Sequence, residues 1–106
     1  MSGWNERERA IEELYQHDQE NQFKALTKAH RSFGRWVADQ MSLSHSEAEH
    51  YAEGFVQDFI DGATTDALLQ KACIDLSKAS IYHPKIFLEQ EYESFFREAF
   101  TQIHDR

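Results

Sequence analysis

The sequence predicts an all-α fold, a compact four-helix bundle with a long first helix whose N-terminal part is a frayed or partner-folding arm. Apolar residues recur at helical spacing in four segments, and no segment alternates between apolar and polar residues as a strand would. Short connections with helix start and stop signals separate these segments. The predicted helices span residues 5–41, 46–61, 66–79 and 84–104.

The first predicted helix has two unequal parts. Asn5 is a candidate N-cap, and Glu8 follows it three residues later, as in a capping box. A thin apolar seam then runs along one side of the helix and consists of Trp4, Ile11, Leu14 and Tyr15. Seven polar residues, 16–22, interrupt it before a fuller stripe begins at Phe23. We therefore divide the chain into an N-terminal arm, residues 1–22, and a four-helix domain, residues 23–106.

The free energy of folding the arm alone is close to balance or unfavourable. Burial of the four seam side chains yields roughly 6–12 kcal/mol. Ordering about fifteen residues costs on the order of 15–30 kcal/mol of backbone entropy, which hydrogen bonds only partly offset. We therefore expect the arm to fray, or to fold fully against a partner. The alternative is that the arm docks on its own domain as an ordinary solvated helix.

Each of the four domain helices has an apolar stripe at helical spacing. In the first, the stripe is interrupted by Gly34, which indicates close approach of another helix. The predicted inner residues are Phe23, Leu26, His30, Phe33, Trp36 and Val37 in the first helix, and Ala48, Tyr51, Ala52, Phe55, Val56, Phe59 and Ile60 in the second. They are Leu69, Ala72, Cys73 and Leu76 in the third, and Leu88, Tyr92, Phe95, Phe96, Ala99 and Ile103 in the fourth.

Local signals mark where these helices start and stop. Ser44 with Glu47 matches a capping box, and Ser46 with Glu49 is the alternative register. Gly62 is a plausible C-terminal stop for the second helix. The third helix has three candidate caps, Thr64, Thr65 and Asp66, and the only proline, Pro84, suits the first turn of the fourth.

Composition argues against several classes of function. The net charge of −8, with 11 basic residues that form no cluster, disfavours nucleic acid and anionic lipid as partners. Cys73 is the only cysteine, so no internal disulfide exists, and its apolar surroundings predict a buried, inert thiol. Without a signal peptide or an apolar run of ~20 residues, the chain is expected to be cytosolic and not inserted in a membrane.

No constellation of residues predicts catalysis, a metal or another cofactor. A di-iron bundle needs paired Glu-x-x-His motifs, and the chain supplies one, Glu47 to His50. His17 and Asp18 are adjacent on a helix and point about 100° apart, which disfavours a hydrogen-bonded base pair. We therefore predict no enzyme, and expect the aromatic residues of the fourth helix to be core rather than a ligand groove.

An ordered series of residues resembles a known family. It comprises Arg7-Glu8, Ala10, Glu12, Tyr15, His17-Asp18, Glu20 and Phe23-Lys24-Ala25, and continues with Gly34, Trp36, Ala38, Glu47-Ala48 and Tyr51-Ala52. This pattern resembles the zeta inhibitor subunit of alphaproteobacterial F-type ATP synthases. The chain departs from the family at residues 28–32, where a basic run is common, and in its unusually aromatic C-terminal half.

The resemblance implies a regulatory inhibitor that inserts its helical arm into the catalytic head, between alpha and beta subunits near the central stalk, and blocks rotation during ATP hydrolysis. The expected apolar contacts are Trp4, Ile11, Leu14 and Tyr15, and the expected polar contacts are Arg7, Glu8, Glu12, His17 and Asp18. The free protein is expected to be a monomer, and the bound protein to lie at the cytoplasmic face of the inner membrane. Two alternatives stay open: a non-inhibitory interaction module of the same fold, and a bundle that binds a small ligand or nucleotide.

Overall fold

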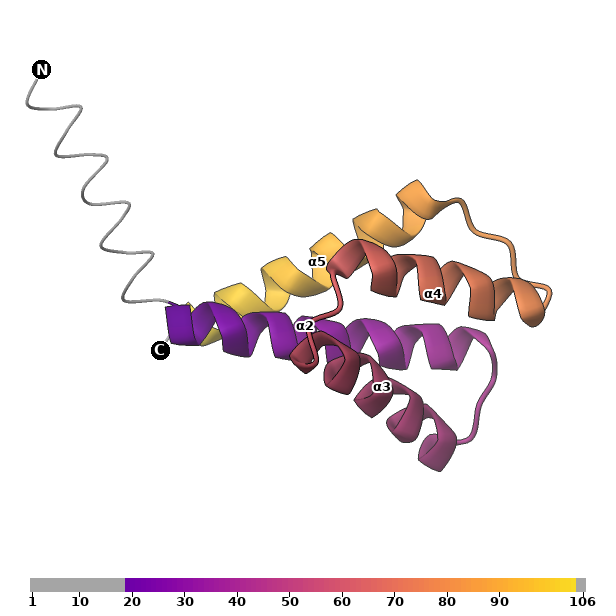
Figure 1. Ribbon diagram of the computed structural model, residues 1–106, viewed down its shortest axis with the longest axis horizontal. Coiled ribbons are helices and arrows are strands. Elements are labelled where there is room, and N and C mark those ends of the chain that lie inside the picture. Colours follow the sequence, from indigo (N-terminus) through magenta and orange to yellow (C-terminus); the bar gives the residue numbers. More distant parts are fainter. Residues whose placement is uncertain (1–18, 105–106) are drawn as a thin grey trace, which may run out of the picture.

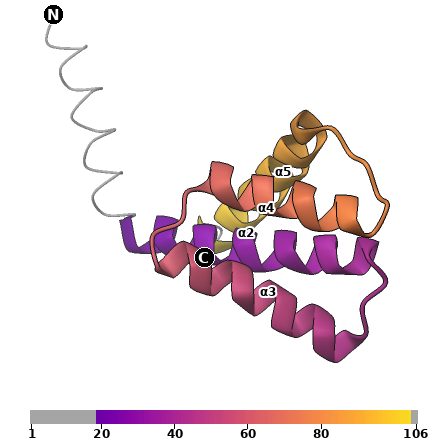
Figure 2. The same cartoon turned by 45° about the vertical axis from the view of Figure 1, so that its right-hand side comes forward.

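The computed structural model describes residues 19–104, which form four helices and no strand. These are α2 (Gln19–Gln40), α3 (His45–Ile60), α4 (Thr65–Lys78) and α5 (Lys85–His104) (Figure 1). Successive helices run in opposite directions, and α2 packs against both α3 and α5. Figure 1 and Figure 2 show α3 on one side of α2, with α4 and α5 on the other. The predicted all-α, four-helix fold is therefore confirmed.

The helix ends use the predicted local signals. Ser44 caps α3 in the predicted capping box: its hydroxyl accepts from the Glu47 amide at 3.2 Å, while the Glu47 carboxylate accepts from the Ser44 amide. Gly62 follows the C-cap Asp61 with a φ of +106°, a left-handed conformation that glycine adopts without strain. Thr64 is the cap of α4, and its hydroxyl accepts from the Ala67 amide.

The core lies along the inner side of α2, where the other three helices meet it. Its fully buried residues are Ala29, Phe33 and Val37 from α2, Phe55 from α3, Leu68, Leu69, Ala72 and Leu76 from α4, and Leu88 and Tyr92 from α5. Gly34 allows α3 to approach closely, because a Cβ at this position would lie 3.1 Å from the Ala52 Cα. The predicted reason for Gly34 is thus confirmed.

Several predicted inner residues are only partly buried, and two of them are exposed. Phe23 and Ile60 expose 51% and 53% of their surface, and Cys73 is half-buried rather than buried. The first two were misassigned because α3 ends beside the middle of α2, as the packing of Phe59 on His30 shows. Helical spacing within one segment carries no information about where its neighbour ends. Leu68, which the predicted stripe omitted, is 3% exposed and belongs to the core.

Candidate interaction site

The residues predicted to contact a partner precede the part of the chain that the structure describes. They are Trp4, Arg7, Glu8, Ile11, Glu12, Leu14, Tyr15, His17 and Asp18. Their contacts and the proposed division at residues 22 and 23 therefore stay predictions. The structure does describe the first turns of α2, the base from which the arm departs.

The first turns of α2 lie alongside the end of α5 (Figure 1). Ala25 and Ala29 are both fully buried. On the outer edge, the Lys28 ammonium donates to the Gln102 side-chain carbonyl, joining the start of α2 to the end of α5. The start of α2 is therefore tied to the end of α5 through Lys28 and Gln102.

His30 is the one charged or polar residue with a fully buried side chain in the described part of the chain, with 1% of its surface exposed. Its ring stacks on Phe59 of α3, with centroids 4.4 Å apart, and tilts against Tyr92 of α5 at 5.1 Å. Nδ1 donates to the Leu26 carbonyl at 2.6 Å, since a carbonyl oxygen only accepts. Nε2 then carries the lone pair of the neutral ring and has no hydrogen-bond partner among the described residues.

These surroundings disfavour the charged form of His30. Burial lowers its pKa, and the hydrogen bond to the Leu26 carbonyl opposes that effect only in part. The nearest titratable ring, Tyr92, is itself kept neutral because burial raises its pKa. The junction of α2, α3 and α5 is therefore built around a neutral imidazole.

Ion pairs along the outer edge fix the register of α2 against α3. Arg31 Nε donates to the Glu53 carboxylate at 2.8 Å, and Arg35 bonds Glu49 as well as Asp39. Exposed pairs of this kind contribute about 0–1 kcal/mol each. These pairs therefore align α2 with α3 more than they stabilise the fold.

A partly buried polar cluster joins α3 to α4. The Tyr51 hydroxyl donates to the Asp75 carboxylate at 2.7 Å, and the Lys71 ammonium lies 3.6 Å from the same carboxylate. Lys71 also lies over the rings of Tyr51 and Phe55, 4.9 and 5.0 Å from their centroids. Burial, together with the adjacent Asp75 carboxylate, raises the pKa of Tyr51. Each group has a structural partner, which argues for a structural role.

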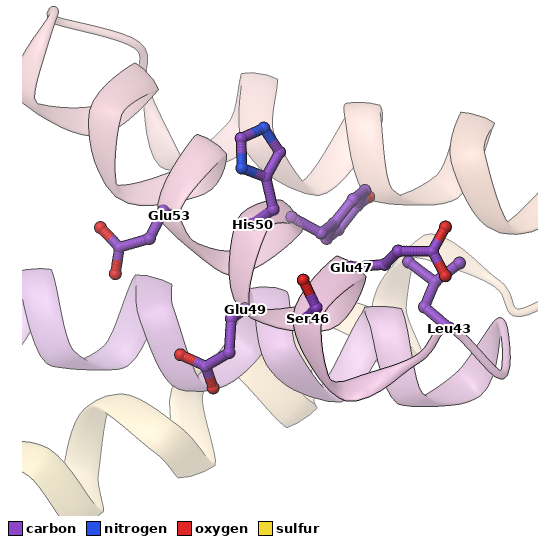
Figure 3. A pocket seen from close by; sticks show the side chains of 7 residues that line it. Leu43, Ser46, Glu47, Glu49, His50 and Glu53 are labelled. Carbon is purple, nitrogen blue, oxygen red and sulfur yellow. The ribbon is translucent and has the colours of Figure 1, made fainter.

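A hollow of about 620 Å³ lies on the outer face of α3. Its lining includes three acidic residues, Glu47, Glu49 and Glu53, together with His50 (Figure 3). The labelled side chains diverge from one another instead of converging on one point. Glu47 and His50 are both exposed on α3. This arrangement suits solvation rather than ligand binding.

The described helices offer neither a metal centre nor a membrane span. Within residues 19–104, no group of three or more His, Cys, Asp or Glu side chains is placed to hold a metal ion. No helix in that range is both long and apolar enough to cross a bilayer.

Comparison with known proteins bears on the whole chain. No curated protein and no solved structure matches it. A family model described as ATPase inhibitor subunit zeta matches residues 1–102, which includes both the arm and nearly all of the helical domain. Because that match covers almost the full 106 residues, the chain belongs to the ATPase inhibitor subunit zeta family.

Proposed function

We propose that this chain inhibits ATP hydrolysis by inserting its N-terminal arm as a helix into the catalytic head of F-type ATP synthase. The observation that carries the proposal is the phase of the arm's apolar seam. Ile11 precedes Ala29 by eighteen residues, and Tyr15 precedes Phe33 by the same number. Eighteen residues make about five helical turns, so both seam residues fall in line with buried core positions of α2.

A helix that extends α2 backward through the arm would therefore carry its seam on the core-facing side. Among residues 19–104, no other helix covers that side of the extended helix. The last turn of α3 packs beside His30, and the last turn of α5 lies alongside the first turns of α2 (Figure 1). A helical arm needs a groove on another protein to bury its seam, as in helix-in-groove recognition.

Inhibition of this kind requires binding and no bond chemistry. The seam residues Trp4, Ile11, Leu14 and Tyr15 supply burial, and the flanking charged residues set the register. The groove lies between alpha and beta subunits near the central stalk, where an inserted helix opposes rotation in the hydrolysis direction. No catalytic residue and no cofactor is needed, in keeping with a regulatory family.

The cellular location and the oligomeric state of the free protein follow from the same proposal. The protein is cytoplasmic and monomeric when free, and reaches the cytoplasmic face of the inner membrane only through ATP synthase. The net charge of −8 opposes direct binding to anionic lipid.

The test compares the full chain with a variant that lacks residues 1–18. The truncated protein should keep a cooperative thermal transition, because the buried residues of α2 begin at Ala25. It should no longer inhibit ATP hydrolysis by the ATP synthase of the same organism. Equal inhibition by both proteins would rule out insertion of the arm. A full chain that binds the synthase without inhibiting it would favour the non-inhibitory interaction module.

A further inference from the structure

An apolar surface at one end of the α2–α3 pair is only partly covered by the fold. Phe23 and Ile60 are both about half exposed, at 51% and 53%. The Phe59 ring lies 5.6 Å from the Phe23 ring, and Ile60 follows Phe59 as the last residue of α3. These three residues are called the Phe23–Ile60 surface below.

This surface is open because α2 is longer than α3. Phe59 stacks on His30, so the last turn of α3 lies beside that residue. Phe23 lies seven residues earlier on α2, roughly 10 Å along the helix. Figure 1 shows the first turns of α2 projecting beyond the end of α3, with α5 alongside them. The side of α2 that α3 covers elsewhere is therefore only partly covered at its start, where Phe23 is 51% exposed.

We propose that the Phe23–Ile60 surface docks on apolar side chains at the rim of the groove that receives the arm. This inference rests on the proposed function and adds a second contact to it. Tyr15, the last apolar residue of the arm, precedes Phe23 by eight residues, about 12 Å of helix. An arm that is buried as far as Tyr15 brings this end of the bundle against the protein that holds the arm.

Phe23 lies close in sequence to the arm, which distinguishes the Phe23–Ile60 surface from the other exposed apolar residues. The first described residue, Gln19, lies four residues before Phe23. Three other exposed apolar residues, Ile74, Tyr82 and Ile86, belong to α4, the connection after it and α5. That connection meets the far end of α2, where His83 bonds Gln40 at 3.2 Å, about 30 Å from the start of the helix. These residues provide a matched control.

The test titrates ATP synthase of the same organism with three full-length proteins and follows ATP hydrolysis. One variant combines Phe23→Glu with Ile60→Glu, and the control combines Ile74→Glu with Ile86→Glu, so both gain the same charge at comparably exposed positions. The first should need about tenfold more protein for half-inhibition, as expected for loss of an apolar contact. The control should stay within about twofold of wild type. Thermal unfolding establishes that each variant is folded.

A neutral variant separates lost apolar contact from charge repulsion. Phe23→Ser combined with Ile60→Ser should weaken inhibition in the same direction. If wild type inhibits and neither variant of this surface differs from it, the docking proposal is overturned while insertion of the arm stands. Tighter inhibition by the variants also overturns it, since the surface would then hold the chain's own arm in the free protein. A wild-type chain that does not inhibit contradicts the proposed function itself.

Discussion

Gly34 of α2 lies so close to α3 that a methyl group there would stand 3.1 Å from the Ala52 Cα and 3.2 Å from Phe55 Cγ. Gly54, on the exposed side of α3, has no such neighbour within 4 Å. The two helix-interior glycines therefore differ in the space around them. At Gly34 space is the limit, whereas at Gly54 a side chain has room.

This contrast predicts opposite effects of the same substitution. Gly54→Ala should raise the free energy of unfolding by about 0.5–1 kcal/mol, through helix propensity. Gly34→Ala gains the same propensity but forces two packed helices apart, and should lower the free energy of unfolding by about 1 kcal/mol net. Chemical denaturation of both variants measures the difference. Equal stabilisation by the two would show that α3 can shift away without cost.

The burial of His30 predicts loss of stability in acid. Its folded-state pKa is lowered, so the unfolded chain binds a proton first as the pH falls below the ordinary value of about 6.5. The stabilising effect of the neutral ring is therefore complete above that pH and declines below it. A proton on Nε2 would be buried between Phe59 and Tyr92 without an acceptor among the described residues.

Thermal unfolding between pH 5 and pH 8 checks this dependence. His30→Phe keeps an aromatic ring against Phe59 but cannot be protonated, so its melting temperature should depend less on pH than that of wild type. His50→Gln, on the exposed side of α3, is the control and should keep the wild-type slope. If His30→Phe and wild type lose stability in parallel, another group governs the acid response.

Because the Tyr51 hydroxyl donates a hydrogen bond to Asp75, its removal should lower the free energy of unfolding. Tyr51→Phe leaves the ring beneath Lys71 but removes a 2.7 Å charge-assisted bond, and should cost about 1–2 kcal/mol of unfolding free energy. Tyr82→Phe removes a hydroxyl from a side chain that is 76% exposed, and should change little. Urea titrations of the two variants provide the comparison. A cost below about 0.5 kcal/mol for Tyr51→Phe would mean that water replaces the bond.

Features that depend on neighbouring residues in the chain were predictable from the sequence. The capping box at Ser44, the stop at Gly62 and the buried faces around Phe33 and Phe55 follow from local spacing, and all are confirmed. The exposure of Phe23 was not predictable, because it depends on where α3 ends relative to α2. The stripe of α2 has the same appearance whether or not a partner helix covers its first turns.

The candidate site also has features that the sequence predicts and features that only the tertiary structure reveals. Composition placed an apolar seam in the arm, and the structure supplies the core positions with which that seam is in phase, Ala29 and Phe33. His30 was predicted on the inner stripe, but its stack on Phe59, and an Nε2 without a partner among residues 19–104, required the tertiary arrangement. The contacts proposed for the arm are with a second protein, so neither this chain's sequence nor its fold contains them.

The last prediction concerns the individual anchors of the arm. Leu14→Ala and Tyr15→Ala should each weaken inhibition of ATP hydrolysis by about 2 kcal/mol, roughly thirtyfold in affinity, because each loses a desolvated apolar contact. Glu13→Ala alters a charge outside the seam and should have a much smaller effect. If the arm gains its packing only in the complex, as proposed, none of the three should shift the thermal transition of the free protein. Titrations of ATP synthase with each variant measure the affinities. If Glu13→Ala proves as damaging as Tyr15→Ala, charge and not apolar burial dominates recognition of the arm.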